Sequence, residues 1–266
     1  MSEIIHRKRD LFIGRGNQRL AGGFEQIERL SRRRFLATGG VAVGGAVLGF
    51  LGETAHGDRA VKTGQFVFPR LQFSVYDNTP DIWDVWPRGD VNLRKQLRKL
   101  TNINASPDAK VVRLDDFDDM CRHPFVFMTS EGYFRLKEHE ERNLREFLER
   151  GGFVLADDCV YNAKEDRFFR TYNKLMNKLF PDNPMRKIPY DHEIFHVYYD
   201  FEHGCPHLQG VPHGAHGLFE RGTGRLMTIN CPGDIHCGWV SRFFPPERNL
   251  EAIKMGINIV IYFLSH

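Results

Sequence analysis

Short apolar runs alternate with longer amphipathic stretches along residues 66–264. Runs of strand length predict five β-strands, at residues 66–74, 110–114, 124–129, 153–156 and 225–230. The run at 124–129 is apolar throughout, which is typical of a strand covered on both faces. We therefore expect helices on both sides of a sheet.

Apolar side chains at helical spacing occupy the stretches between these runs. They predict helices over residues 93–100, 137–150, 168–180 and 248–264. In the second helix Leu144, Phe147 and Leu148 share one side, and Gly151 and Gly152 supply a C-cap directly before the next strand. This β-α-β order predicts a three-layer α/β fold. We expect one domain over residues 58–266, where no repeat or linker divides the chain.

The front of the chain has the features of an export signal. Residues 31–36 read S-R-R-R-F-L and fit the twin-arginine pattern, with Arg32 and Arg33 as the paired arginines. The stretch 35–51 that follows is apolar but contains five glycines in 17 residues. A spanning helix needs roughly 20 strongly apolar residues, so no stable membrane span is expected.

Residues 1–57 are accordingly predicted to be a twin-arginine signal region, with the twin-arginine translocase as partner. The small residues near Ala55 and Asp58 suggest cleavage there, but no clear A-x-A site is present. An uncleaved signal that tethers the protein to the membrane remains an alternative. The expected location is periplasmic or otherwise extracytoplasmic.

The net positive charge of the chain comes from its first 60 residues. The net charge is +3, and residues 1–60 contain 10 Lys or Arg against 6 Asp or Glu. The remainder is close to neutral and has no broad basic surface, so we do not expect nucleic-acid binding.

Five cysteines follow the signal region, at positions 121, 159, 205, 231 and 237. No C-x-x-C pair indicates a zinc ribbon or redox centre, and an odd number allows at most two disulfides. Cys231 and Cys237 flank a Pro-Gly-Asp turn and could pair. Buried, unpaired thiols are the alternative.

Several motifs appear in an order that resembles a known bacterial family. They are F-x-F-P-R-L at 66–71, the Trp83/Trp86 loop, the long segment from Glu140 to Cys159, L-F-P at 179–181, D-H-x-I-F-H at 191–196 and D-x-x-C-G-W at 234–239. The chain resembles domain-of-unknown-function family 4159 over about residues 65–265. The resemblance implies a flavodoxin-like parallel sheet with helices on both faces, a variant of the class I glutamine amidotransferase-like fold. It implies no reaction.

An amidotransferase nucleophile of that fold is a Cys in a G-x-C-x-G turn after a strand. The corresponding residues here are Asp157-Asp158-Cys159-Val160-Tyr161, which lack both glycines. A carboxylate directly before the sulfur is expected to raise its pKa and oppose thiolate formation. We therefore interpret Cys159 as a structural or pocket-wall thiol and assign no catalytic residue.

Open α/β sheets bind ligands beyond the carboxyl ends of their strands. Polar and aromatic residues that follow the predicted strands or lie in nearby loops are candidates for ligand binding, namely Asp77, Trp83, Asp157, Asp158, His192, Asp234 and Trp239. Each Asp alone could equally be a helix cap or turn former, and each Trp could pack in the core.

Histidines are numerous in the second half of the chain. The segment from His192 to His196 reads H-E-x-x-H, but Pro189 precedes it and Val197 to Tyr199 suggest a strand, so a long metalloprotease helix is not expected. A looser site for a divalent metal such as zinc is the alternative, with His192 and Asp234 as ligands. Histidines at 203, 207, 213 and 216 lie in a Gly/Pro-rich loop, either near that site or simply solvated.

Two functions remain open from the sequence. The first is an exported, non-catalytic amidotransferase-like domain that binds a small molecule or a cell-envelope protein. The second is a metal-assisted hydrolase acting on an envelope or extracellular substrate, with Asp157, Asp158, His192 and Asp234 at its site.

Overall fold

The computed structural model describes residues 64–75, 83–160 and 164–266. The strands are β1 (Pro69–Gln72), β2 (Lys110–Arg113), β3 (Phe125–Ser130), β4 (Phe153–Asp158), β5 (Arg186–Lys187), β6 (His216–Phe219) and β7 (Leu226–Cys231). The helices are α2 (Arg88–Leu100), α3 (Phe117–Arg122), α4 (Glu138–Glu149), α5 (Arg167–Leu179), the 3-10 turn η1 (Glu193–Phe195), α6 (Ile235–Val240) and α7 (Pro246–Ser265).

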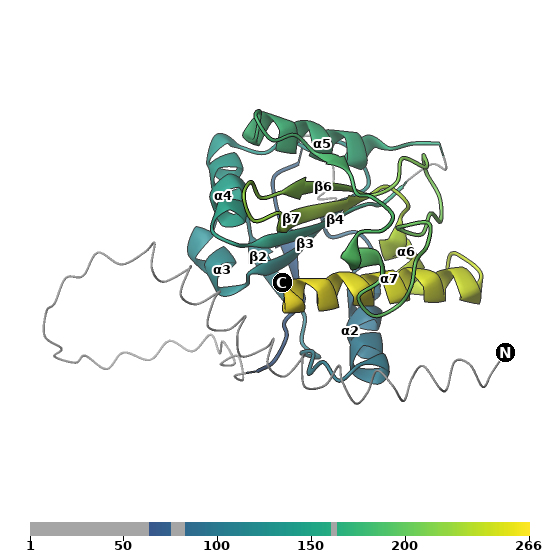
Figure 1. Cartoon of the computed structure of the whole chain (residues 1–266). Helices are drawn as coiled ribbons and strands as arrows, with labels where there is room; N and C mark the ends of the chain where they lie inside the picture. Colours follow the sequence, from purple (N-terminus) through teal and green to yellow (C-terminus); the bar gives the residue numbers. More distant parts are fainter. Residues whose placement is uncertain (1–63, 76–82, 161–163) are drawn as a thin grey trace, which may run out of the picture.

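The strands form one sheet in the order β2-β1-β3-β4-β7-β6-β5. Figure 1 shows this sheet between α5 above and α7 below. The first five strands in this order are parallel, whereas β6 and β5 are antiparallel to their neighbours. The parallel strands, counted along the chain, lie in the order 2-1-3-4-5, which is that of flavodoxin-like doubly wound sheets. The expected three-layer α/β architecture is therefore confirmed at the level of a mostly parallel sheet between helices.

Each face of the sheet has its own hydrophobic core. One core joins the sheet to α2, α6 and α7, and contains Leu93, Trp239 and Ile257. The other joins it to α3, α4 and α5, and contains Leu144 and Phe168. The strands β3, β4 and β7 are buried along their whole length because helices cover both of their faces.

The predicted strands and helices are present with shifted ends. The helix expected over 137–150 is α4, and its C-terminal Gly151 has a φ of 105°, a conformation that favours glycine. Gly152 permits close packing, because a Cβ atom there would lie 2.5 Å from the Phe147 ring.

The elements missed by the sequence pattern are short. They are α3, β5, β6 and α6, each six residues or fewer. The strand suggested by Val197 to Tyr199 is absent, and these residues lie in turns and bends after η1. The side chains of Val197 and Tyr199 instead pack against the core that includes α7, whereas Tyr198 is exposed.

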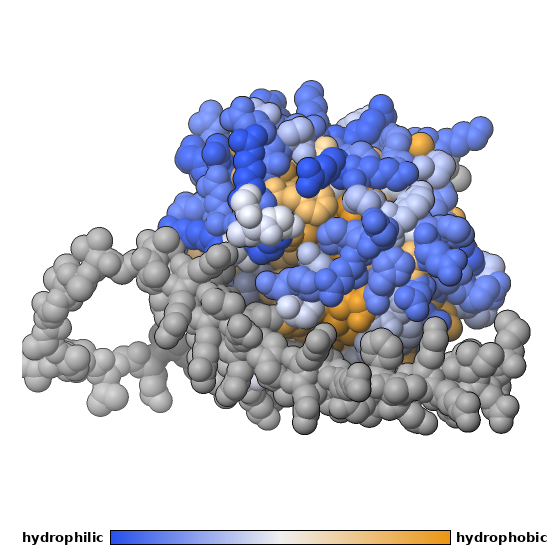
Figure 2. Space-filling view, in the orientation of Figure 1, coloured by the Kyte–Doolittle hydropathy of each residue, from blue (hydrophilic) through white to orange (hydrophobic). Residues whose placement is uncertain are grey.

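Hydrophilic residues cover most of the visible face of the described domain, with hydrophobic residues recessed between them (Figure 2). Among the described residues, no helix combines the length and apolar character needed to cross a membrane. The paired arginines at 32 and 33 lie outside the described residues.

Candidate functional site

The carboxyl ends of β3, β4 and β7 lie side by side at one edge of the sheet. Ser130 pairs in register with Asp158, and Asp157 pairs with Cys231. Parallel pairing brings the residues after these strands together, so Cys159 and Asp234 meet at this edge. Here we call Asp157, Cys159, Asp234, His236 and Cys237 the carboxyl-edge cluster; all five are buried.

Asp157 connects β4 to the first turn of α6. Its Oδ1 accepts a hydrogen bond from the Ile235 backbone N–H at 3.2 Å, and its Oδ2 accepts one from the His236 N–H at 3.0 Å. These amides have no partner inside the helix, so the carboxylate satisfies them. Asp157 thereby fixes the position of α6 against the end of β4.

Asp234 is the N-cap of the same helix. Its backbone is left-handed, with a φ of 55°, and its Oδ1 accepts a hydrogen bond from the Cys237 N–H at 3.3 Å. The Gln209 side chain donates to Oδ2 and to the Val160 carbonyl. The carboxylate is therefore engaged on both oxygens.

Asp158 serves the opposite face of the sheet. Successive strand side chains point to opposite faces, so Asp158 is directed away from α6. Its Oδ2 accepts a hydrogen bond from the Phe169 N–H in the first turn of α5 at 3.0 Å. The adjacent Asp157 and Asp158 thus support two different helices and do not form a shared two-carboxylate pocket.

Burial sets the protonation of these carboxylates. It raises the pKa of Asp157 well above its ordinary value, with a further contribution from the charge of Asp234. Burial likewise raises the pKa of Asp234, and it raises the pKa of Asp158 to about 7. The edge is therefore a crowded acidic region that favours a neutralising proton or cation.

A buried charge network borders the cluster. Arg70, in β1, makes a bidentate pair with Asp90 of α2, at 2.8 Å from Nε to Oδ2 and 2.7 Å from Nη2 to Oδ1. Arg70 Nη1 also donates to the carbonyls of Trp83 and Val85. His236 Nε2 lies 3.3 Å from Asp90 Oδ1. Burial alone would raise the pKa of Asp90, but the hydrogen bond to His236 and the charge of Arg70 hold it below its ordinary value.

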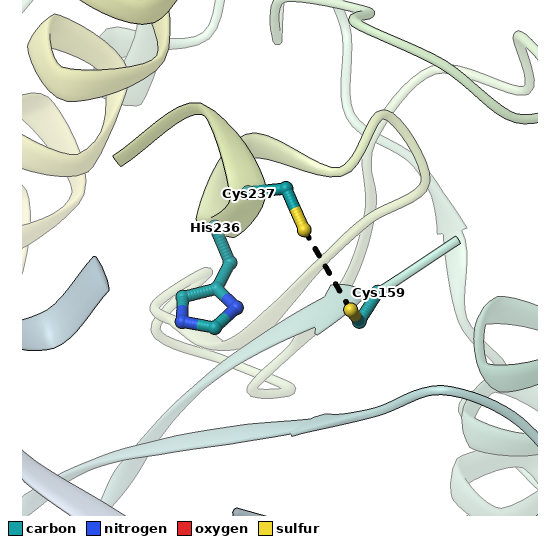
Figure 3. Close-up of side chains that lie close together, drawn as sticks. All are labelled: Cys159, His236 and Cys237. Carbon is teal, nitrogen blue, oxygen red and sulfur yellow. Dashed lines mark hydrogen bonds between the residues drawn. The ribbon is translucent and has the colours of Figure 1, made fainter. Parts of the chain in front are cut away.

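Cys159 and Cys237 face each other across the edge. Their sulfur atoms are 3.7 Å apart, and all five cysteines are free thiols (Figure 3). The contact with Cys237 lowers the pKa of Cys159, but burial and nearby Asp234 raise it, with a raised pKa as the result. The expected direction is thus confirmed, although Asp158 is not the cause. The pairing of Cys231 with Cys237 is not seen, and Cys231 instead interacts with Cys205.

The structure separates His192 from Asp234. The His192 ring packs on Phe219 and Tyr262, at centroid distances of 5.6 and 5.5 Å. Phe219 pairs with Leu226, the first residue of β7, whereas Asp234 comes after Cys231, the last residue of β7. His192 and Asp234 therefore lie near opposite ends of β7, which is about 16 Å long at the usual rise per strand residue. A joint metal site of His192 and Asp234 is therefore incompatible with this geometry.

The H-E-x-x-H segment forms the single turn η1, as its flanking residues predict. His192 Nδ1 accepts a hydrogen bond from the Ile194 N–H at 3.2 Å, which caps that turn. The loop histidines have other partners. His213 Nε2 lies 2.6 Å from Asp166 Oδ2, and His216 Nδ1 lies 3.2 Å from Asn173 Nδ2. Within the described residues, none of these histidines belongs to a group with metal-ligand spacing.

The aromatic candidates have three different environments. Trp239 is fully buried, its ring contacts Phe127, and its Nε1 donates to the Ala252 carbonyl, so it is a core residue and cannot wall a pocket. Trp83 is half-buried against the core that includes α4 and α5, and its Nε1 has no hydrogen-bond partner among the described residues. Asp77 lies outside the described residues.

Sequence patterns did not predict a role at this edge for Arg70, Asp90 or Gln209. A signal was available for Arg70, because an arginine inside an apolar strand run requires a buried partner. Asp90 and Gln209 lie in ordinary polar contexts and carry no comparable signal. Their roles become visible only when α2 and the loop before β6 pack against α6.

Comparison with known proteins supports the resemblance in the motifs. No curated protein matches the chain. The family described as Domain of unknown function (DUF4159) matches residues 67–264, which contain the whole described sheet and the carboxyl-edge cluster. The match spans well over half of the 266 residues, and the chain therefore belongs to the DUF4159 family.

Proposed function

We propose that this protein is an exported, non-catalytic domain that binds a small ligand or a cell-envelope protein on an amidotransferase-like scaffold. The observation that carries the proposal is the state of the residue at the nucleophile position. The Cys159 thiol is 3% exposed, has a raised pKa and contacts a second thiol. A nucleophilic cysteine needs the opposite conditions, namely access and a stabilised thiolate.

The carboxylates at the edge support the same conclusion. Asp157 and Asp234 use their oxygens to hold backbone amides of α6, and Asp158 holds α5. A metal-assisted hydrolase would need these oxygens for the metal or for water. The geometry therefore favours the binding role over the hydrolase that the sequence left open.

An exposed aromatic pair provides a surface for binding. Trp86 and Phe243 are each 42% exposed, and their rings meet edge to face at 4.8 Å. Exposed aromatic residues often dominate the binding energy of interfaces. Trp86 also has a φ of 43°, a conformation that is costly for a bulky residue and that occurs disproportionately at functional sites.

A photo-crosslinking residue at position 86 tests the binding role in intact cells. We expect a discrete cross-linked species that disappears with Phe243→Ala, since both rings form the surface. The matched control is the same label at Tyr190, which is 47% exposed and distant from this pair in the chain. Equal labelling at both positions, or none at position 86, would contradict the binding surface.

A turnover assay tests the absence of catalysis. The purified protein should release no ammonia from glutamine and no burst of nitrophenol from an activated ester. A burst equal to the protein concentration that Cys159→Ala abolishes would refute the non-catalytic assignment.

A further inference from the structure

The carboxyl-edge cluster contains three potential metal ligands on two elements. Cys159 directly follows β4, while His236 and Cys237 lie in the first turn of α6. One ligand atom from each of the three residues lies within 4.8 Å of the others, and all three residues are buried. Within the described residues, this is the group of His, Cys, Asp or Glu side chains that has metal-ligand spacing.

The sulfur spacing fits a metal ion. Two thiolates that bind one Zn²⁺ at about 2.3 Å with tetrahedral angles lie about 3.8 Å apart. The observed distance between Cys159 Sγ and Cys237 Sγ is 3.7 Å. A trigonal Cu⁺ site has a similar sulfur spacing, and thiolate with imidazole is a ligand set that both ions accept.

An unpartnered nitrogen provides independent support. His236 is fully buried, and its Nδ1 has no hydrogen-bond partner in the part of the chain that the structure describes. Figure 3 shows this nitrogen, next to the point where the ring joins the side chain, turned toward the two sulfur atoms. A buried polar atom without a partner is costly, and metal coordination would remove that cost.

The other ring nitrogen of His236 is held from outside the cluster. Arg70 Nη2 lies 3.0 Å and Asp90 Oδ1 lies 3.3 Å from His236 Nε2. When the Nε2 proton points to Asp90, the Nδ1 lone pair faces the sulfurs, which is the tautomer that ligation requires. A carboxylate behind a ligating imidazole is the usual support for a metal-bound histidine.

We infer that Cys159, His236 and Cys237 bind one thiophilic d¹⁰ metal ion, Zn²⁺ or Cu⁺. Asp157 and Asp234 position the ligands, because they hold the backbone amides of residues 235 to 237. Binding releases the two thiol protons, and the cation offsets the acidic surroundings of the cluster. This inference goes beyond the proposed binding role, which does not require a metal.

Metal content of the purified full chain is the first test. We expect one zinc or copper ion per chain in the wild type, with Zn and Cu measured separately by elemental mass spectrometry. Cys159→Ser and Cys237→Ser should each lose the ion, because serine is a poor ligand for both metals. Cys121→Ser is the matched control, since Cys121 lies in α3, outside the cluster. Equal metal content in all four proteins would overturn the site.

A second measurement needs no variant of the cluster. Co²⁺ added to metal-stripped wild type should give a thiolate-to-cobalt charge-transfer band and the intense visible bands of tetrahedral cobalt. The same bands should appear with Cys121→Ser. A cobalt spectrum without the thiolate band would overturn the inference. A Cys159–Cys237 disulfide in the metal-free, freshly isolated protein would also overturn it.

Discussion

At the scale of single residues, the main feature is how buried charges are satisfied. Arg70 is 3% exposed, and Asp90 and two backbone carbonyls accept its hydrogen bonds. Removing one partner of such a pair leaves the other charged and buried, which costs far more than the intact pair contributes. The network therefore fixes the position of the loop around Trp83 relative to β1 and α2.

Replacement of Arg70 tests this network. Arg70→Ala should lower the free energy of unfolding by about 3–5 kcal/mol, because Asp90 would remain buried without its partner. Urea unfolding followed by circular dichroism measures the change. The control Arg113→Ala removes an exposed pair with Asp115 and should leave stability unchanged. Similar losses in both variants would contradict the role of burial.

Asp157 offers a second test with a smaller change in shape. Asp157→Asn replaces one carboxylate oxygen with an amide NH₂, which would face the N–H of Ile235 or His236. We expect a loss of about 1–3 kcal/mol in unfolding free energy, the cost of a buried group left without a partner. The same change at exposed Asp182 should have no effect on the unfolding curve.

Single residues also show how far the sequence predicts the site. The convergence of Asp157 and Asp234 follows from strand order, because parallel strands end at one edge. The separation of Asp158 follows from side-chain alternation, which the sequence analysis did not apply to this pair. The position of His192 could not be predicted, since it depends on the antiparallel strand β6 and on the end of α7.

At the scale of elements, the short helix α6 organises the edge. It has six residues, too few to be stable alone, and depends on Asp157, Asp234 and its packing against α2 and α7. This explains why a periodicity search missed it. The long segments α4, α5 and α7 were predicted because their apolar faces extend over several turns.

Gly89 in α2 tests the packing of α2 against α6. A Cβ atom at Gly89 would lie 2.7 Å from His236 Nε2. Helix propensity alone predicts that Gly89→Ala gains up to about 1 kcal/mol. We expect a loss of about 1–3 kcal/mol instead, because the added methyl group must displace the buried ring.

The control for this prediction is Gly132→Ala, where the nearest atom to a Cβ would be Arg167 Nη1 at 3.8 Å. Thermal unfolding of both variants should show a lower midpoint for Gly89→Ala alone. A stabilised Gly89→Ala protein would mean that α2 and α6 are not packed as closely as described.

At the scale of the whole molecule, the predicted twin-arginine signal at residues 1–57 can be tested together with the α/β domain that follows it. Twin-arginine transport carries folded proteins, so a metal ion could be bound before export. Replacing Arg32 and Arg33 together with Lys should retain the precursor in the cytoplasm, as measured by cell fractionation. Arg34→Lys is the matched control, because the pattern leaves that position free, and it should be exported normally. Normal export of the double variant would contradict the signal assignment.

The most direct test of the account is the accessibility of the Cys159 thiol in the folded protein. Iodoacetamide labelling in the presence of a chelator, with each cysteine quantified by peptide mass spectrometry, reports it. We expect the half-buried Cys121 and Cys205 to react first, and the buried Cys159 to react only when denaturant unfolds the domain. Rapid and selective labelling of Cys159 in the native protein would reveal an accessible thiolate and would contradict a sealed, non-catalytic site.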